Sequence, residues 1–314
     1  MKNVLEYINK NSDYVSVNND KIKSFVENIS NWKYNYWMSD LKEYLDEKKC
    51  IIFAFICESI NFCFWGNKNN NDSNYENYIG SEEFFCNLKQ SVKNDSSILE
   101  IDKLINLTEN EFISLIGSEF IELPLLQERY KMLKDTISII YNKKESFYKE
   151  LFSIRNDLEM LNYITQNFLH FDDKSLYKNQ VIRFNKRATL LVNDLYQLSD
   201  TIKNNLKSLD NLTGCADYAL PRLLCEYGIL NYDEKLLEII TSNVFIEHNS
   251  DMEIEIRANT LYALELIKDA LKEKNIYLNS VEIDNIIWTM RTTKEHSIPV
   301  HKTINFNSQS RIKQ

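Results

Sequence analysis

The stretch Gly214-Cys215-Ala216-Asp217-Tyr218-Ala219-Leu220-Pro221 joins a glycine, an acidic residue among apolar neighbours and a proline. The chain has only 5 glycines and 3 prolines in 314 residues, so each of them marks a specific backbone geometry. Proline fits the first position of a helix, and Gly228 fits the C-terminal cap of a helix that begins near Leu220. We therefore expect Asp217 in the turn before this helix, where the helix dipole favours a carboxylate.

The rest of the chain is poor in glycine and proline and has apolar residues at helical spacing, which indicates an all-α protein. We expect a single helical domain over residues 1–306, with a frayed tail over 307–314. A small β-hairpin or short strands would fit best in the polar segment 66–74. Helices are predicted within 1–48, at 80–92, from 107, at 125–141, at 147–168, from about 180, at 232–244, from 253 and from 279, whereas 50–65 is a buried helix or strand.

The balance of charges excludes some partners. Lys and Arg number 37 against 46 Asp and Glu, which gives a formal net charge of −9. Non-specific binding to nucleic acid or to an anionic membrane needs a basic surface, so neither is expected. The apolar run from Cys50 to Trp65 is interrupted by polar residues and is shorter than the roughly 20 residues of a membrane helix. The N-terminus has no signal-peptide pattern, so we expect a cytoplasmic protein.

The cysteines and histidines do not suggest a metal site. The 6 cysteines include no Cys-x-x-Cys pair, which indicates reduced thiols in a cytosolic protein. The 4 histidines are not spaced as metal ligands. The sequence also lacks a glycine-rich phosphate loop, a Gly-x-Ser-x-Gly elbow and a His-Glu-x-x-His motif. We expect neither a metal nor an organic cofactor.

Two polar patterns on predicted helices have a structural and a functional interpretation. Arg257 begins an apolar stripe, so its guanidinium is expected to point inward, either in a buried ion pair with Glu255 or Glu265 or in a substrate site. Asp284 and Trp288 are i,i+4 neighbours, which fits a solvated helix edge or a pocket that combines an acceptor with a stacking surface. The stripe itself consists of Leu261, Leu264, Ile267 and Leu271. From the residues alone, an enzyme and a helical interaction protein remain open.

Seven segments, in order over about residues 50–306, together resemble the queuosine salvage proteins. They are Ser59-Ile60-Asn61-Phe62-Cys63-Phe64-Trp65, Pro124-Leu125-Leu126-Gln127-Glu128-Arg129, Phe184-Asn185-Lys186-Arg187-Ala188, Ala216-Asp217-Tyr218-Ala219-Leu220-Pro221, Glu253-Ile254-Glu255-Ile256-Arg257, Ile283-Asp284-Asn285-Ile286-Ile287-Trp288 and Pro299-Val300-His301-Lys302. The resemblance implies a fold like that of the helical DNA glycosylases. It also implies hydrolysis of the N-glycosidic bond of queuosine 5′-monophosphate, which releases queuine for reinsertion into tRNA, with no cofactor.

The chemistry of this reaction restricts the residue types that can catalyse it. Queuine is a 7-deazaguanine, so the base cannot be activated by protonation at N7. A carboxylate near the sugar can stabilise an oxocarbenium-like charge or activate water. A second carboxylate can accept hydrogen bonds from the base, an aromatic ring can stack on it, and a cation can hold the phosphate. The partner implied is therefore a small molecule rather than a nucleic acid.

The resemblance assigns these roles to particular residues. Asp217 matches the catalytic aspartate of the family's Phe-Ala-Asp-Tyr motif, and Asp284 with Trp288 matches a late Asp-x-x-x-Trp pattern of the queuine pocket. Asp217 and Asp284 are both expected to be catalytic. Lys186 and Arg187 match a basic pair before a helix, which binds phosphate or forms an ion pair. Substrate contacts are also expected for a further set of residues, namely Cys215, Arg257, Thr289 and His301.

Three departures from the family pattern affect these expectations. Cys215 stands where the motif has its phenylalanine, so a stacking face is lost. Thr289 follows Trp288 where some relatives have a second aspartate. No histidine precedes residue 170, although the family pattern has an early one that contacts the base. These differences leave open activity on the free nucleoside, and the alternative of a non-catalytic protein that binds queuine or a deazapurine nucleotide.

Overall fold

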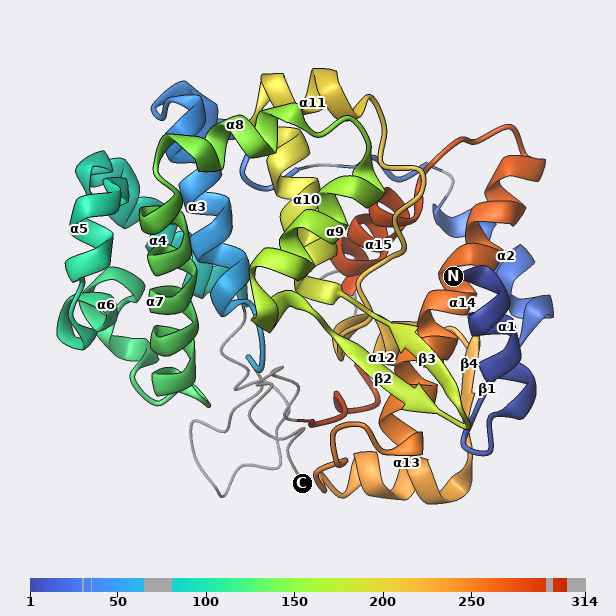
Figure 1. Ribbon diagram of the computed structural model, residues 1–314. Coiled ribbons are helices and arrows are strands. Elements are labelled where there is room, and N and C mark those ends of the chain that lie inside the picture. The colour runs from blue at the N-terminus through green and yellow to red at the C-terminus, as the bar shows by residue number, and fades with distance from the viewer. Residues whose placement is uncertain (30, 35, 65–80, 292–295, 304–314) are drawn as a thin grey trace. The chain divides into compact units, whose positions relative to one another are not determined.

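The computed structural model describes residues 1–29, 31–34, 36–64, 81–291 and 296–303 (Figure 1). The segment 66–74 and the tail 307–314, for which we had predictions, lie outside these residues. Within the described residues there are fifteen α-helices and four short strands, so the predicted mainly α class is confirmed. The chain divides into two compact units, here called unit 1 (residues 1–35, 172–189 and 209–305) and unit 2 (residues 36–171, 190–208 and 306–314). The single domain and the likeness to DNA glycosylases remain predictions.

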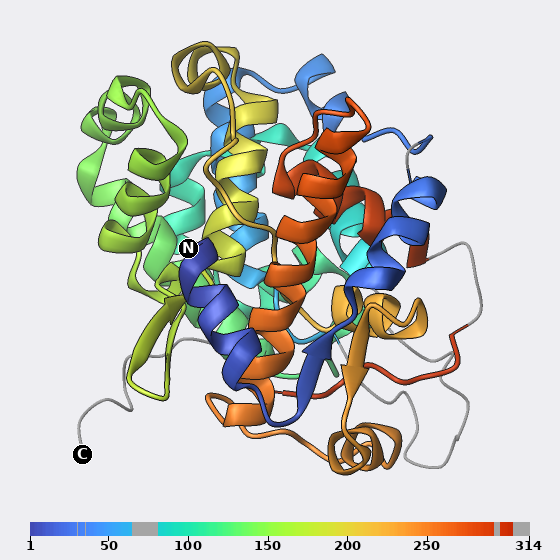
Figure 2. The same ribbon diagram turned by 90° about the vertical axis from the view of Figure 1, so that its right-hand side faces the viewer.

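Unit 1 is built around one long helix, α14, Asp251–Glu273. The helices α1, α2, α12 and α15 and the strand β1 all pack against it (Figure 2). The predicted stripe of Leu261, Leu264, Ile267 and Leu271 is buried on this helix, as expected. The other elements of unit 1 are α1 Lys2–Asn11, β1 Val15–Val17, α2 Asn19–Ile29, β2 Lys174–Tyr177, β3 Gln180–Arg183, α12 Ala219–Glu226, β4 Leu230–Tyr232, α13 Glu234–Thr241 and α15 Ser280–Met290.

The strands of unit 1 form two antiparallel pairs. Strand β1 pairs with β4, and β2 pairs with β3 in a hairpin. The hairpin turn consists of Lys178 and Asn179, with φ of 43° and 68°, as a two-residue turn of this kind requires. We had expected a loop over 171–178 followed by the opening of a helix, and this was wrong. The turn contains no glycine, which is the usual signal for such a hairpin.

The helix after Asp217 has the predicted limits. Helix α12 begins at Ala219 and ends at Glu226, and Pro221 lies in its first turn. Gly228 has a φ of 69°, and beyond it the N–H of Ile229 donates to the carbonyl of Leu224 at 2.9 Å. This is the glycine-dependent helix end that the sequence predicted.

Unit 2 consists of helices and short 3₁₀ turns. Its central contact is that of α3 with α7, and α5 packs on α7 as well. The stretch 50–65, predicted as helix or strand, lies largely in α3, which Asp46 caps by accepting from the N–H of Lys49. The helices are α3 Glu47–Ile60, α4 Ser81–Asn94, α5 Ile101–Asn106, α6 Glu109–Ile116, α7 Leu126–Lys143, α8 Glu145–Ser153, α9 Asp157–Asn167 and α11 Asp200–Leu206, with 3₁₀ turns η1 Ser39–Glu43, η2 Ser96–Leu99, η3 Ser118–Phe120 and η4 Leu169–Phe171.

One predicted helix of unit 2 is in fact two. The stretch 147–168 is broken between α8 and α9, because Asn156 has an extended backbone and its side chain caps α9 by accepting from the N–H of Glu159. The helices predicted from 107 and from 279 are present, and each begins with a capping box, at Thr108 and at Asn279. Helix α10, Lys186–Leu198, begins with residues of unit 1 and ends with residues of unit 2. In the part of the chain that is described, no helix is both long enough and apolar enough to cross a membrane.

Candidate functional site

The loop before α12 passes very close to two helices of unit 1. A Cβ atom at Gly214 would clash with Cδ1 of Leu264 on α14, and would lie 3.0 Å from Oδ2 of Asp284 on α15. A side chain has no room here, although the φ of this residue is not unusual. Gly214 therefore allows the main chain to approach Asp284, and the next residues place Asp217 in the same region.

Asp217 has two polar contacts that stabilise a negative charge. Its Oδ1 accepts a hydrogen bond from the N–H of Ala219, in the first turn of α12, at 2.8 Å. Its Oδ2 lies 3.7 Å from Nζ of Lys186. The Asp217 and Lys186 side chains are 17% and 14% exposed, so solvent reaches both. The structure thus brings together an acidic and a basic side chain, Asp217 and Lys186, that lie 31 positions apart in the sequence.

Asp284 is held in a very different environment. Its Oδ2 accepts from the main-chain N–H of Cys215 at 2.6 Å, and the residue is only 6% exposed. Burial raises the pKa of Asp284 to about 8; the hydrogen bond from Cys215 opposes this shift, and the charge of Asp217 adds to it. Asp284 therefore holds a proton at neutral pH. The pair thus combines a solvated carboxylate with a buried carboxylic acid.

The basic pair Lys186–Arg187 opens α10. The first N–H groups of a helix have no carbonyl partner inside it, so they favour an anion. Lys186 is directed to Asp217, as described above. Arg187 is 7% exposed, and its charge contributes to lowering the pKa of Asp173. Both interpretations of this pair, phosphate binding and ion pairing, are compatible with these contacts.

The predicted base-binding residues of α15 follow Asp284 by about one turn. Trp288 is half-buried, and the guanidinium of Arg291 lies 3.6 Å from the centre of its ring. The hydroxyl of Thr289 donates to the carbonyl of Asn285 within the helix at 2.8 Å. The side chain of Cys215 is buried. The substrate contacts of Trp288, Thr289 and Cys215 remain predictions.

His301 is buried near the charged groups of the site. Burial lowers its pKa to about 4, an effect that the nearby charges of Glu253 and Asp217 oppose and that of Arg257 reinforces. The imidazole is therefore neutral at physiological pH. His301 thus lies close enough to interact electrostatically both with Asp217 and with the charged residues Glu253 and Arg257 of α14.

Arg257 forms a buried ion pair, but not with the predicted partners. Its guanidinium contacts both carboxylate oxygens of Asp173, with Nη1 at 3.2 Å from Oδ1, and also contacts Glu253 at 3.2 Å. Glu253 lies four residues earlier on the same helix, a spacing from which the sequence could have predicted the pair. Asp173 lies 84 positions away, in a segment that we had interpreted as a plain loop. A direct contact of Arg257 with substrate is not supported by this geometry.

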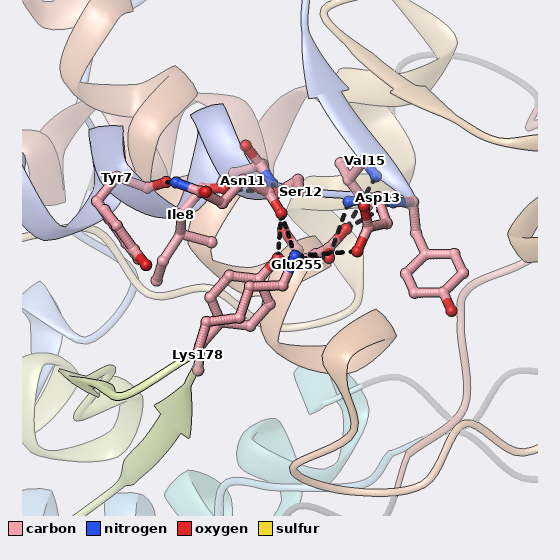
Figure 3. Close-up of polar contacts among 11 residues, drawn as sticks. Tyr7, Ile8, Asn11, Ser12, Asp13, Val15, Lys178 and Glu255 are labelled. Carbon is pink, nitrogen blue, oxygen red and sulfur yellow. Dashed lines mark hydrogen bonds and ion pairs between the residues drawn. The ribbon is translucent and has the colours of Figure 1, made fainter.

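Glu255, one of the expected partners, points to a different part of unit 1. It accepts from the main-chain N–H groups of Asp13, Tyr14 and Val15 at 2.7–3.2 Å, and from the hydroxyl of Tyr177 at 2.8 Å (Figure 3). This buried carboxylate fixes the start of β1 to α14. The other expected partner, Glu265, forms an ion pair with Lys268 instead.

Two of the seven family-like segments of the sequence contact each other in unit 2. They are the segment that begins at Ser59 and the segment that begins at Pro124. Arg129 on α7 is fully buried, and its guanidinium donates to the carbonyls of Ile60, Phe62 and Cys63. Cys63 has a positive φ of 50°, which is unusual for a residue with a side chain. Arg129 therefore fixes the main chain just after α3, including Cys63 with its positive φ.

A buried acidic pair lies beside this segment of unit 2. Asp194 on α10 and Glu58 on α3 are each 2% exposed. The hydroxyl of Tyr36 donates to Asp194 at 3.1 Å, and the amide of Asn61 donates to Glu58 at 3.0 Å. Burial, together with the charge of Glu58, raises the pKa of Asp194 well above its usual value. The folded protein therefore favours the uncharged form of the Asp194 carboxyl group. Across the described ranges, no group of three or more His, Cys, Asp or Glu side chains could hold a metal ion.

Comparisons with known proteins match this chain over most of its length. The sequence profile of a family described as queuosine salvage protein matches residues 41–306. A protein of Sphaerobacter thermophilus is 27% identical, over 87% of this chain and 84% of its own length. Proteins of Dictyostelium discoideum and mouse are 26% and 24% identical, over 91% and 95% of this chain and 87% and 95% of their own lengths. All three are named queuosine 5′-phosphate N-glycosylase/hydrolase.

Proposed function

Since the chain belongs to the queuosine salvage protein family, we propose that it is an enzyme that hydrolyses the N-glycosidic bond of queuosine 5′-phosphate and releases queuine. The observation that carries the proposal is the pairing of two different acids beside one loop. Asp217 is a carboxylate next to a lysine, and Asp284 is a protonated acid hydrogen-bonded to Cys215. Glycosidases use such a division of labour between two acidic groups.

In this mechanism Asp217 acts on the sugar. As the bond between C1′ and the base breaks, positive charge develops on the ribose, and the carboxylate stabilises it. Water then adds to C1′, and Asp217 can accept a proton from it. The products are free base and ribose 5-phosphate. Lys186 and the Ala219 N–H orient this carboxylate before substrate binds.

Asp284 acts on the departing base. The base leaves with the electron pair of the broken bond and needs a proton, which cannot be placed on N7 because queuine has carbon there. Asp284 holds a proton at neutral pH and can supply it to another atom of the base. We had expected this residue to accept hydrogen bonds from the base as a carboxylate, and its raised pKa favours the role of donor.

The remaining predicted contacts are proposals of the same kind. Lys186 and Arg187, at the N-terminus of α10, would bind the 5′-phosphate together with the helix N–H groups. Trp288 would stack on the base, and His301, Cys215 and Thr289 would line its surroundings. A cytoplasmic location, which we also propose, agrees with the lack of a disulfide bond among the cysteines of the described residues.

The test is incubation of the purified protein with queuosine 5′-phosphate and, separately, with queuosine. Free queuine is then measured by mass spectrometry. Release from the phosphate alone supports the proposal in full, whereas equal release from both would remove the phosphate-binding role of Lys186 and Arg187. Tight binding of queuine with no release from either compound would contradict an enzymatic function. It would favour the alternative of a non-catalytic queuine-binding protein, which the departures at Cys215 and Thr289 left open.

A further inference from the structure

Among the described residues of unit 1, Arg257 is the most completely enclosed cation. It is 2% exposed, and the carbon of its guanidinium lies 3.9 Å from the centre of the Phe184 ring. Besides its ion pairs with Asp173 and Glu253, its Nε donates to the carbonyl of Ala216 at 3.4 Å. All three nitrogens of the guanidinium are thus engaged within the protein.

Two contacts of Arg257, with the carbonyl of Ala216 and with the ring of Phe184, lie in the segments that carry Asp217 and Lys186. Ala216 directly precedes Asp217. On the other side, the carbonyl of Asp173 accepts from the N–H groups of Phe184 and Asn185, which directly precede Lys186. The side chain of Asn185 in turn accepts from the N–H of Asp173. Arg257 therefore touches both segments, from a helix that is itself fixed in the core.

The charges explain why an arginine is needed at this position. Burial is the largest single influence on Asp173 and Glu253 and opposes their ionisation, but Arg257 and the nearby His248 together outweigh it and lower the pKa of both carboxyl groups. Lysine would keep the charge but lacks the planar fork that reaches several acceptors at once. The carbonyl of Ala216 and the ring of Phe184 would then lose their common contact.

We propose that Arg257 is a positioning residue that holds Asp217 next to Lys186, by joining the segments that precede these two residues. This role rests on the proposed function for its kinetic test, but the position of Asp217 can be measured without any activity. It also differs from substrate binding, since the guanidinium nitrogens of Arg257 are engaged by Ala216, Asp173 and Glu253.

The experiment compares Arg257→Lys with a matched control, Glu255→Gln. Glu255 is equally buried and lies two residues away on α14, but its partners are at the start of β1 and on Tyr177. Both variants should lower the melting temperature. Assayed below both transitions, R257K should lose roughly 10- to 100-fold in kcat with KM nearly unchanged, since a displaced catalytic group is this costly. E255Q should retain its kcat.

A crystal structure of R257K supplies the independent readout. We expect the separation of Asp217 Oδ2 and Lys186 Nζ to exceed its present 3.7 Å. An unchanged separation, or a rise in KM with kcat intact, would overturn the positioning role. Failure of the parent protein to release queuine would instead refute the proposed function and leave the structural comparison valid. If R257K does not fold, Asp173→Asn removes the main ion pair and should show the same displacement to a smaller degree.

Discussion

Asp284 on α15 accepts a hydrogen bond from the main-chain N–H of Cys215, two residues before Asp217. This contact joins the buried Asp284 to the loop that carries Asp217. The two aspartates were predicted as a pair of carboxylates, but their environments separate them. Asp217 is partly exposed to solvent and lies beside a lysine, whereas Asp284 is enclosed and neutral.

The buried acid should make the stability of the protein depend on pH. The pKa of Asp284 is about 8 in the folded protein, against about 3.9 for an unperturbed aspartate. Between these values the folded state keeps a proton that the unfolded state releases, so stability falls as pH rises from about 4 to 8. The slope due to this group is at most about 1.4 kcal/mol per pH unit.

Asp284→Asn removes this titration and keeps an oxygen that can accept from Cys215. Urea unfolding at pH 5 and pH 8 should therefore show a gain in stability over the parent that is larger at pH 8. A gain of the same size at both pH values would mean that Asp284 is already ionised when folded.

The activity of the parent enzyme should fall on the alkaline side as Asp284 loses its proton. The profile of kcat/KM against pH reports the groups of the free enzyme, so we expect a descending limb near pH 8. It is measured by queuine release from queuosine 5′-phosphate at constant ionic strength. A profile that stays flat to pH 9.5 would exclude Asp284 as the proton donor.

Asp217→Asn should bind substrate and fail to turn it over. The amide keeps the size of the side chain and can still accept from the Ala219 N–H, but it carries no charge for the sugar. We expect a loss of about 10²- to 10³-fold in kcat, with substrate affinity by calorimetry within a few-fold of the parent. Asp210→Asn, an exposed change on the preceding loop, serves as control. Robust turnover by D217N would remove Asp217 from the chemistry.

Local rules predicted much of the fold, because their signals lie within a few residues of one another. The capping boxes, the stripe on α14 and the helix end at Gly228 are of this kind. The hairpin after Asp173 was missed because its turn, Lys178-Asn179, lacks glycine. The break between α8 and α9 was missed because an apolar pattern continues across it.

The site was predictable only in part. A resemblance to known proteins indicated Asp217, Asp284 and Lys186, but neither spacing nor composition could place them together. The ion pair of Arg257 with Asp173 joins residues 84 positions apart and leaves no trace in the sequence. The pKa of Asp284 depends on burial and on Cys215, so its protonation also required the three-dimensional arrangement.

Gly214→Ala should destabilise the protein through a clash with Leu264, by about 1–3 kcal/mol as for other overpacked cores. Leu264→Ala alone creates a cavity and should cost about 2–5 kcal/mol. In the double variant the new methyl group has room. The double variant should therefore lose less stability than the sum of the losses in the two single variants. Urea unfolding of all four proteins measures this coupling. Strict additivity would show that the loop of Gly214 moves away instead.

Asp194→Asn should stabilise the protein at neutral and alkaline pH. Asp194 is buried beside Glu58, and its pKa is raised well above the usual value, so the folded state must keep a proton that the unfolded state loses above about pH 4. Stability of the parent therefore decreases as pH rises beyond that point. The asparagine carries no charge and its oxygen can still accept from Tyr36.

Thermal unfolding at pH 5 and pH 8.5 measures the effect on each variant. The control is Asp200→Asn on α11, an exposed carboxylate that pairs with Lys42 and should bring no gain. We expect D194N to exceed the parent in melting temperature by more at pH 8.5 than at pH 5. A lower melting temperature at pH 8.5 would show that the Asp194 carboxylate is charged when folded, and that the protein stabilises this charge by a contact with α3 or Tyr36 that asparagine cannot replace.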